Sequence, residues 1–171
     1  MARSLNGLGD VARLQGDLVR AAGHYRRALT ILDGLRSTDG IFPSFNLALI
    51  DLSEQRFSAT EGALGEIREN LERLGWGGLL SCVHVCLLAC AAQSRDWGTW
   101  DDHLGLGATA LRTSGLVDPD VAWAAELAGR LTEWAGQPAR AREVYEVALA
   151  QWRGLGDAGG VARIERVLPG L

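Results

Sequence analysis

Three cysteines stand in a short row and are the residues of this sequence best suited to metal or redox chemistry. Cys82, Cys86 and Cys90 follow one another at intervals of four residues, so they lie on one face of a helix. Only sulfurs on adjacent turns could meet, no fourth ligand is near, and His84 lies about 200° around the helix from Cys82. Because free cysteine is among the most buried residue types, we expect the three side chains to pack in a core. We therefore predict no metal, no cofactor and, with an odd number of thiols, no disulfide framework.

A histidine beside two aspartates is a second combination that could serve a metal ion or acid–base catalysis. Asp101, Asp102 and His103 are consecutive in the chain. Consecutive residues on a helix diverge by about 100°, so these three cannot converge on one ion. We predict that His103 belongs to a solvated helix face. His24, next to Tyr25, is likewise predicted to lie on the surface of its helix.

The motifs of common enzyme families do not occur in the chain. The glycine-rich stretch Gly75-Trp76-Gly77-Gly78 lacks the Gly-Lys-Ser/Thr ending of a phosphate-binding loop and follows a helix, so we predict a linker. No Gly-x-Ser-x-Gly, His-Glu-x-x-His or Cys-x-x-Cys motif is present. We predict that the protein is not an enzyme and has no catalytic residue, since an enzyme built on the cysteine row would need a reactive, exposed thiolate.

Composition and charge argue against several classes of partner. The chain has 171 residues, of which 47% are apolar, and a net charge of −4, which gives no electrostatic footprint for nucleic acid. It has no run of 18 uncharged apolar residues and no apolar stretch at its N-terminus, so we expect neither a membrane span nor a signal peptide. The predicted compartment is the cytoplasm. All 17 basic residues are arginine, a bias that indicates a GC-rich genome.

A repeat of about 40 residues organises the sequence. Two segments 120 residues apart share small and aromatic positions: Gly16, Ala21, Tyr25, Ala28 and Leu29 recur as Gly136, Ala141, Tyr145, Ala148 and Leu149. In two weaker copies between them, Gln55 and Arg95 take the place of the glycine, and Leu64 and Leu104 that of the tyrosine. The predicted turn positions 16, 55, 95 and 136 are then spaced by 39, 40 and 41 residues.

Apolar residues within each copy recur every three or four positions, which predicts pairs of amphipathic helices joined by short turns. Short side chains allow the two helix axes to approach closely, and an aromatic such as Tyr25 fills the space between hairpins. Asp118-Pro119 predicts a capped helix start, and residues 75–78 a break. The predicted helices are 3–15, 18–36, 42–54, 57–74, 78–94, 97–114, 119–135, 138–153 and 158–168.

These positions resemble the signature of the tetratricopeptide repeat family. The residues that carry the resemblance are Leu5, Leu8, Gly9, Ala12, Gly16, Ala21, Tyr25 and Ala28, and again Ala125, Ala128, Gly129, Gly136, Ala141, Tyr145 and Ala148. Asn46-Leu47-Ala48 with Phe57 looks like a divergent second copy. The third copy departs from the family by placing Trp100 where a small alanine is usual, so its packing must differ.

The resemblance implies an all-α fold, an αα-hairpin superhelix of the right-handed solenoid type. It implies a single domain over 1–171, with hairpins at about 2–36, 41–75, 78–115 and 119–154 and a capping helix at 158–168. The family's usual period is about 34 residues. Longer variants such as this one resemble the repeat regions of multidomain bacterial regulators, ATPase- or kinase-linked.

The resemblance also implies that the first helix of each hairpin lines a concave groove that binds a protein partner. Carried over repeat by repeat, the groove residues are Arg3, Asn6, Asp10, Arg13, Phe42, Phe45, Leu49, Val85, Ala89, Trp123, Glu126, Arg130 and Trp134. Phe42, Phe45, Leu49, Val85 and Trp123 would form an apolar strip that accepts a peptide or helix. Arg13 and Arg130 would pair with flanking carboxylates. The alternative is that neighbouring helices close over the strip.

Two further functions stay open at this point. A sensor of small molecules could use the same groove if the groove were closed into a pocket, and the end repeats could serve self-association. The tryptophans give partial guidance: we expect Trp97 and Trp100 in the core and Trp152 against the last helix, whereas Trp123 and Trp134 are candidates for facing a partner.

Overall fold

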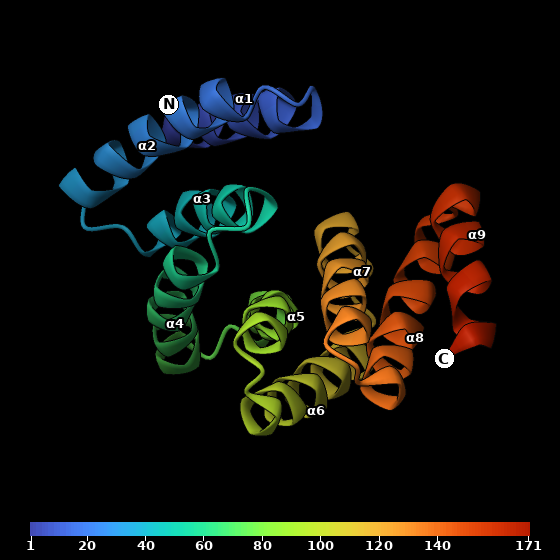
Figure 1. The fold of residues 1–171 in the computed structure, drawn as a ribbon. Helices are drawn as coiled ribbons and strands as arrows, with labels where there is room; N and C mark the ends of the chain where they lie inside the picture. Colours follow the sequence, from blue (N-terminus) through green and yellow to red (C-terminus); the bar gives the residue numbers. More distant parts are fainter. The chain divides into compact units, whose positions relative to one another are not determined.

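The computed structural model describes residues 1–171 and is entirely helical (Figure 1). The α-helices are α1 (Ala2–Leu14), α2 (Leu18–Gly34), α3 (Ile41–Ser53), α4 (Phe57–Leu74), α5 (Gly77–Ser94), α6 (Trp97–Ser114), α7 (Pro119–Trp134), α8 (Pro138–Leu155) and α9 (Ala158–Val167), with short 3-10 helices η1 (Thr38–Gly40) and η2 (Leu168–Gly170). The all-α prediction is confirmed, and every predicted α-helix agrees with the structure to within two residues at each end.

The chain divides into two compact units, Met1–Ile67 and Arg68–Leu171, and each is described by itself. In the first unit, α1 packs against α2, and α2 packs against α3. In the second, α5 packs with α6, α7 with α8, α5 with α7, and α8 with α9. Packing between consecutive helices and between neighbouring pairs is what repeated αα-hairpins require.

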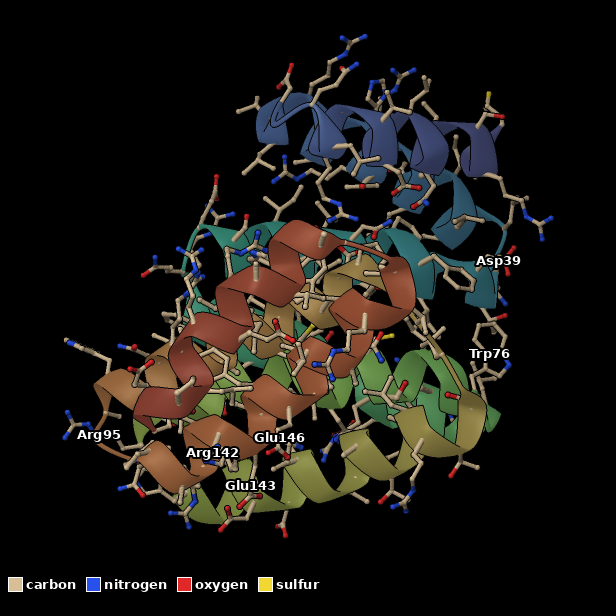
Figure 2. The ribbon with its side chains drawn as sticks, turned by 90° about the vertical axis from the view of Figure 1, so that its right-hand side faces the viewer. Asp39, Trp76, Arg95, Arg142, Glu143 and Glu146 are labelled. Atoms are coloured by element: carbon tan, nitrogen blue, oxygen red, sulfur yellow. The ribbon has the colours of Figure 1, made fainter.

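The repeat is visible in the backbone as well as in the sequence. The four predicted turn positions, Gly16, Gln55, Arg95 and Gly136, all have positive φ, between 58° and 79°. A second series of positive-φ residues, Arg36, Gly75, Gly115 and Gly156, follows the first at a constant distance of 20 residues. A left-handed residue after a helix turns the chain back and satisfies the last carbonyl groups. Arg95 adopts this conformation at a cost that glycine avoids, and its side chain projects outward from the turn before α6 (Figure 2).

Aspartate side chains cap several of the helices that follow these turns. Asp17, Asp96 and Asp157 each accept a hydrogen bond from the backbone N–H three residues later, at 2.9–3.1 Å. Asp118 accepts from the amides of Asp120 and Val121 ahead of Pro119, which confirms the predicted capped start of α7. Each cap satisfies donors that the first turn of a helix leaves without an intrahelical partner.

A glycine and a tyrosine set the closest approach of the two helices in the first and last hairpins. A Cβ on Gly9 would lie 2.4 Å from a ring carbon of Tyr25, and a Cβ on Gly129 would lie 2.5 Å from the equivalent carbon of Tyr145. Both rings are buried, so the glycines are steric requirements and not sites of flexibility. Where leucine replaces the tyrosine, in the second and third copies, the matching position of the first helix is Ala48 or Leu88 and the glycine is absent.

The third hairpin packs differently, as the sequence predicted. Trp100 is fully buried at the position that Ala21 and Ala141 occupy in the outer copies. Seven residues later the chain has Gly107, whose Cβ would lie 3.3 Å from the Cβ of His84 on α5. In this hairpin, α6 thus has a large side chain at Trp100 and no side chain at Gly107, where it lies close to α5.

The close contact at Gly9 gives a direct test of this packing. Gly9→Ala should lower the free energy of unfolding by roughly 1–3 kcal/mol, because the new methyl group overlaps the ring of Tyr25. Gly23→Ala on α2, where a Cβ meets nothing within 4 Å, should raise it by up to about 1 kcal/mol through helix propensity alone. Urea unfolding followed by circular dichroism measures both. The double variant Gly9→Ala/Tyr25→Leu, which copies the second hairpin, should recover part of the loss; a Gly9→Ala protein as stable as Gly23→Ala would contradict the account.

Candidate functional site

The first unit contains an open cavity beside the start of α1. It has a volume of about 350 Å³ and is lined by Ala2, Arg3, Asn6, Leu32, Asp39, Phe42 and Pro43. Just before Phe42, at Gly40, the chain passes close to α2. A Cβ on Gly40 would lie 3.3 Å from the side chain of Leu29. Phe42 follows in the first turn of α3 and remains 46% exposed, although Ala2, Leu32 and Pro43 around it are buried. The cavity therefore has an apolar floor and an accessible aromatic ring.

One polar residue of the lining, Asn6, belongs to a hydrogen-bond network centred on Asp10. Its carboxylate accepts from Tyr25 Oη at 2.8 Å, from Asn46 Nδ2 at 3.1 Å and from Asn6 Nδ2 at 3.3 Å. Asn46 Nδ2 also donates to Asn6 Oδ1, so side chains of α1, α2 and α3 share one network. Burial, together with the hydrogen bond to Asp10, raises the pKa of Tyr25 well above its usual value, so the phenol stays a donor. At the rim, Arg3 pairs loosely with Asp39 at 3.4 Å.

The second unit contains a basic cavity between α7, α8 and α9. It has a volume of about 300 Å³ and is lined by Glu126, Arg130, Tyr145, Arg163, Ile164, Arg166 and Val167. Glu126 is only 8% exposed and accepts from Trp152 Nε1 at 3.1 Å and from Nε and Nη2 of Arg163, both at 3.2 Å. The hydrogen bond to Glu126 raises the pKa of Arg163. Because Arg163 neutralises Glu126, the lining keeps an excess of two positive charges, on Arg130 and Arg166.

The last helix closes the final hairpin, as predicted. A Cβ on Gly160 would lie 2.5 Å from the ring of Trp152, and the Arg163 guanidinium lies 5.4 Å from the centre of the same ring. Arg142 on α8 donates to the carbonyl oxygens of Leu168 and Leu171 at 3.0 and 2.7 Å. Trp152 thus packs against α9, which confirms its prediction, and it contacts two residues of the cavity lining, Glu126 and Arg163.

Five of the thirteen residues predicted to line a groove meet in the two cavities, and the other eight do not. Arg3, Asn6 and Phe42 lie together in the first cavity, and Glu126 and Arg130 lie together in the second. Asp10, Arg13 and Trp123 are half-buried, and Trp134 is 81% exposed. Phe45, Leu49, Val85 and Ala89 are each at most 6% exposed, so the protein itself covers these parts of the predicted apolar strip.

The sequence carries the signal for this burial. Every residue of α5 from Ser81 to Ala92 is buried, and the helix is apolar on all sides. By length and composition α5 is also the one helix apolar enough to cross a membrane, and 67% of it is buried inside the protein. A helix that is apolar all round belongs to a core, and its nominal groove positions then have no route to a partner.

The three cysteines are packed inside the protein, as predicted. Cys82, Cys86 and Cys90 are 4%, 1% and 3% exposed. Burial raises the pKa of Cys82 to about 12 and that of Cys86 well above its ordinary value, so both remain protonated thiols at neutral pH. No group of three or more His, Cys, Asp or Glu side chains is arranged to hold a metal ion.

Burial of the thiols predicts slow chemistry. In the folded protein at pH 7.5, iodoacetamide should leave all three cysteines unmodified over an hour, because all three are buried and Cys82 and Cys86 remain protonated. In 8 M urea the same treatment should modify all three. Intact mass spectrometry counts the additions, and fast single labelling of the folded protein would show that one cysteine is accessible and reactive.

The prediction of a solvated His103 is wrong. His103 is 8% exposed and His84 4%, and their Nδ1 atoms lie 3.0 Å apart between α5 and α6. His103 follows Trp100 by three residues and precedes Gly107 by four, so it shares their inward face; the neighbouring aspartates obscured this signal. His24, also predicted at the surface, is half-buried, with its Nδ1 enclosed and without a hydrogen-bond partner.

In the hydrogen bond between the two Nδ1 atoms, one ring donates and the other accepts. This bond can therefore form when both histidines are neutral. Burial is the main cause that lowers the pKa of each, to about 4 for His103, with smaller contributions from Arg68 and, for His103, from His84. Glu72 opposes the shift at His84, and Asp102 and Asp96 oppose it at His103. Protonating both rings would place two donors against each other.

The pair should make stability depend on pH. The folded-state pKa values lie below the unfolded value of about 6.5, so below pH 6.5 the unfolded chain binds protons that the folded protein does not, and stability is lost down to about pH 4. Replacing both histidines by leucine should reduce the loss between pH 7 and 4.5 by roughly 1–3 kcal/mol relative to the parent protein. Urea unfolding at each pH measures it. The comparison cancels the carboxylates common to both proteins, and parallel profiles would refute the assignment.

Comparison with models of known protein families and with curated proteins gave no match. The repeat is therefore supported by the geometry of the chain itself: the spacing of its turns, the two glycine–tyrosine contacts and the packing of successive helix pairs. The structure establishes an all-helical protein with repeat-like helix pairs, and inference about function starts from the two cavities.

Proposed function

We propose that this protein is a tetratricopeptide-like scaffold that binds a peptide or helix of another protein through side chains on the first helices of its hairpins. The observation that carries the proposal is Phe42, an aromatic ring 46% exposed beside an open cavity in which three predicted groove residues meet. The repeat signature and the two series of left-handed residues at the turns support the proposal that the protein is tetratricopeptide-like. In this proposal the chain acts in the cytoplasm as a module of a bacterial regulatory protein.

The first cavity suits an apolar anchor from the partner. Its floor is apolar, and covering a half-exposed phenyl ring contributes on the order of 1 kcal/mol. The side chain of Arg3, at the rim, is 91% exposed, and its ion pair with Asp39 is long, at 3.4 Å. Arg3 can therefore pair with a charge or a carbonyl of an extended peptide. Aromatic and arginine side chains around a desolvated pocket are the usual composition of a binding hot spot.

The second cavity suits an acidic side chain. Arg130 lies 3.7 Å from Glu126, which Arg163 already binds at 3.2 Å through two nitrogens, and the Arg130 side chain is 56% exposed. Arg166 donates a hydrogen bond from its Nε to the carbonyl oxygen of Ala162. These guanidinium groups can bind a carboxylate with charge-assisted hydrogen bonds. A segment that binds this cavity is therefore expected to carry an acidic residue.

A sensor of small molecules is the second candidate function. Volumes of about 300 and 350 Å³ lie at the lower end of the range of about 300–1,000 Å³ for small-molecule sites. Peptide binding is favoured because each cavity opens beside exposed residues that extend the contact surface, Phe42 and Arg3 in one and Arg130 and Arg166 in the other.

Selection from a random peptide library tests the proposal without knowledge of the partner. The folded protein should enrich peptides with an apolar anchor, peptides with acidic residues, or both. Phe42→Ala should weaken the peptides with an apolar anchor at least tenfold through lost apolar contact, and Arg130→Glu should weaken the acidic peptides at least tenfold through charge repulsion. Isothermal titration calorimetry measures the affinities.

Matched controls separate binding from folding. Leu106→Ala changes a side chain that is 56% exposed on α6, and Arg26→Glu reverses a charge on the exposed face of α2; neither borders a cavity described above. Both should bind as the parent does, and all four variants should keep its melting temperature. Peptides that bind Phe42→Ala and Arg130→Glu as tightly as the parent would exclude both cavities.

A further inference from the structure

Two arginines that line the basic cavity of the second unit are left without a close acidic partner. Arg166 on α9 donates from its Nε to the carbonyl oxygen of Ala162, within the same helix, and its two Nη atoms have no hydrogen-bond partner. Arg130 on α7 has one ion pair, a long one of 3.7 Å to Glu126. The two arginines line the same cavity of about 300 Å³ from different helices, so a group that enters it meets two guanidinium forks.

Glu126 cannot neutralise these two arginines, because its carboxylate is already bound by other side chains. Its two oxygens accept from Nε and Nη2 of Arg163, both at 3.2 Å, and one of them also accepts from Trp152 Nε1 at 3.1 Å. The lining therefore contains one neutral pair, formed by Glu126 and Arg163, and two further positive charges. The nearby Glu133 is exposed, accepts from Tyr145 and lies outside the lining.

The fold itself does not require the two remaining charges. The position of Arg130 in the last hairpin is occupied by Asp10 in the first, and the tyrosine of each hairpin still donates to a carboxylate. Arg166 is exposed, and its hydrogen bond stays within its own helix. Two like charges that line one cavity repel each other, and an anion between them relieves that repulsion. The excess of positive charge therefore points to an anionic ligand.

The number of positive charges favours a phosphate monoester over other biological anions. A carboxylate carries one negative charge and two oxygens, enough for a single guanidinium fork. A phosphodiester of a nucleic acid also carries one charge per phosphate, and the chain's net charge of −4 repels a polyanion. A phosphorylated serine or threonine carries about −1.5 to −2 charges and three acceptor oxygens, which match two guanidinium groups. The cavity is roughly ten times the volume of a water molecule in the liquid, so it has room for this group.

We propose that the basic cavity binds the phosphate of a phosphorylated serine or threonine in a partner segment, between Arg130 and Arg166. This inference rests on the proposed function, because it names the acidic group that the partner places in this cavity. Arg163 is a positioning residue: it neutralises Glu126, which would otherwise repel the phosphate, and the ring of Trp152 holds it in place, 5.4 Å from the guanidinium.

Three degenerate peptide pools that differ at one position test the proposal on the full chain. Each pool has the same random residues on both sides of a central phosphoserine, glutamate or serine. Fluorescence polarisation should show that the phosphoserine pool binds about tenfold more tightly than the glutamate pool, because the phosphate makes additional charge-assisted hydrogen bonds. The serine pool should bind most weakly. A thymidine oligonucleotide, which offers only phosphodiesters, should not displace the phosphoserine pool.

Matched variants place the phosphate in the cavity. Arg166→Gln and Arg130→Gln each remove one of the two charges, and each should reduce the affinity for phosphoserine to about that for glutamate. Arg27→Gln removes an exposed arginine of α2, and Phe42→Ala alters the first cavity. Both should keep the preference for phosphoserine over glutamate. Melting temperatures equal to that of the parent protein show that a variant is folded, and either of the two cavity variants is sufficient for the test.

The outcomes separate this inference from the proposed function. If the glutamate pool binds as tightly as the phosphoserine pool, the cavity is a carboxylate site, and the phosphate proposal is overturned while the scaffold function stands. If no pool binds, both are rejected. A preference for phosphoserine that persists in folded Arg166→Gln and Arg130→Gln proteins, or displacement by the oligonucleotide, would also overturn the phosphate site proposed for this cavity.

Discussion

A close contact between the backbone of a glycine and the ring of a tyrosine sets the spacing of two helix pairs in this protein. In the first and last hairpins, the ring of a buried tyrosine lies where the Cβ of a glycine on the partner helix would be, at 2.4–2.5 Å from the nearest ring carbon. Interiors packed to crystal density tolerate no such overlap, so the pair fixes both residue types at once. It also fixes the distance between the helices, and with it which side chains of the first helix face inward and which remain accessible.

The tyrosine hydroxyl connects this packing to the polar surface. Tyr25 donates to Asp10 at 2.8 Å and Tyr145 to Glu133 at 3.1 Å, so each ring that sets the helix spacing also anchors a carboxylate on the opposite helix. A buried hydroxyl without a partner would cost about 1–3 kcal/mol, which makes the acceptor as necessary as the glycine. In the third hairpin, where leucine replaces tyrosine, a different pair of polar side chains, His84 and His103, meets between the helices.

Sequence reasoning worked where one residue type has one physical meaning. Glycines at a regular spacing located the left-handed turns, and the spacing then located Gln55 and Arg95, which composition alone would never place in that conformation. It failed where tertiary contacts decide. His103 follows two aspartates that suggested a wet surface, yet α5 covers it. Phe45 and Val85 occupy positions that a groove would expose. Both are buried, because their helices are apolar on several faces and pack inside the protein.

The two outer hairpins separate the residues that set the helix spacing from residues whose charge varies between the hairpins. Counted back from the turn glycine, the position that must be glycine is the same in both, Gly9 and Gly129. Three and six residues before that glycine turn, the first hairpin has Arg13 and Asp10, and the last has Glu133 and Arg130, so both charges are reversed.

In each hairpin the tyrosine donates its hydrogen bond to the acidic residue of the two: Tyr25 to Asp10, and Tyr145 to Glu133. The same backbone therefore presents a carboxylate network in one unit and an accessible guanidinium in the other. Under the proposed function, a partner residue suited to one of these equivalent positions would be repelled at the other, which would give specificity by exclusion as well as by attraction. A repeat can diversify its recognition in this way because the helix spacing depends on glycine and ring volume, which the charged positions do not change.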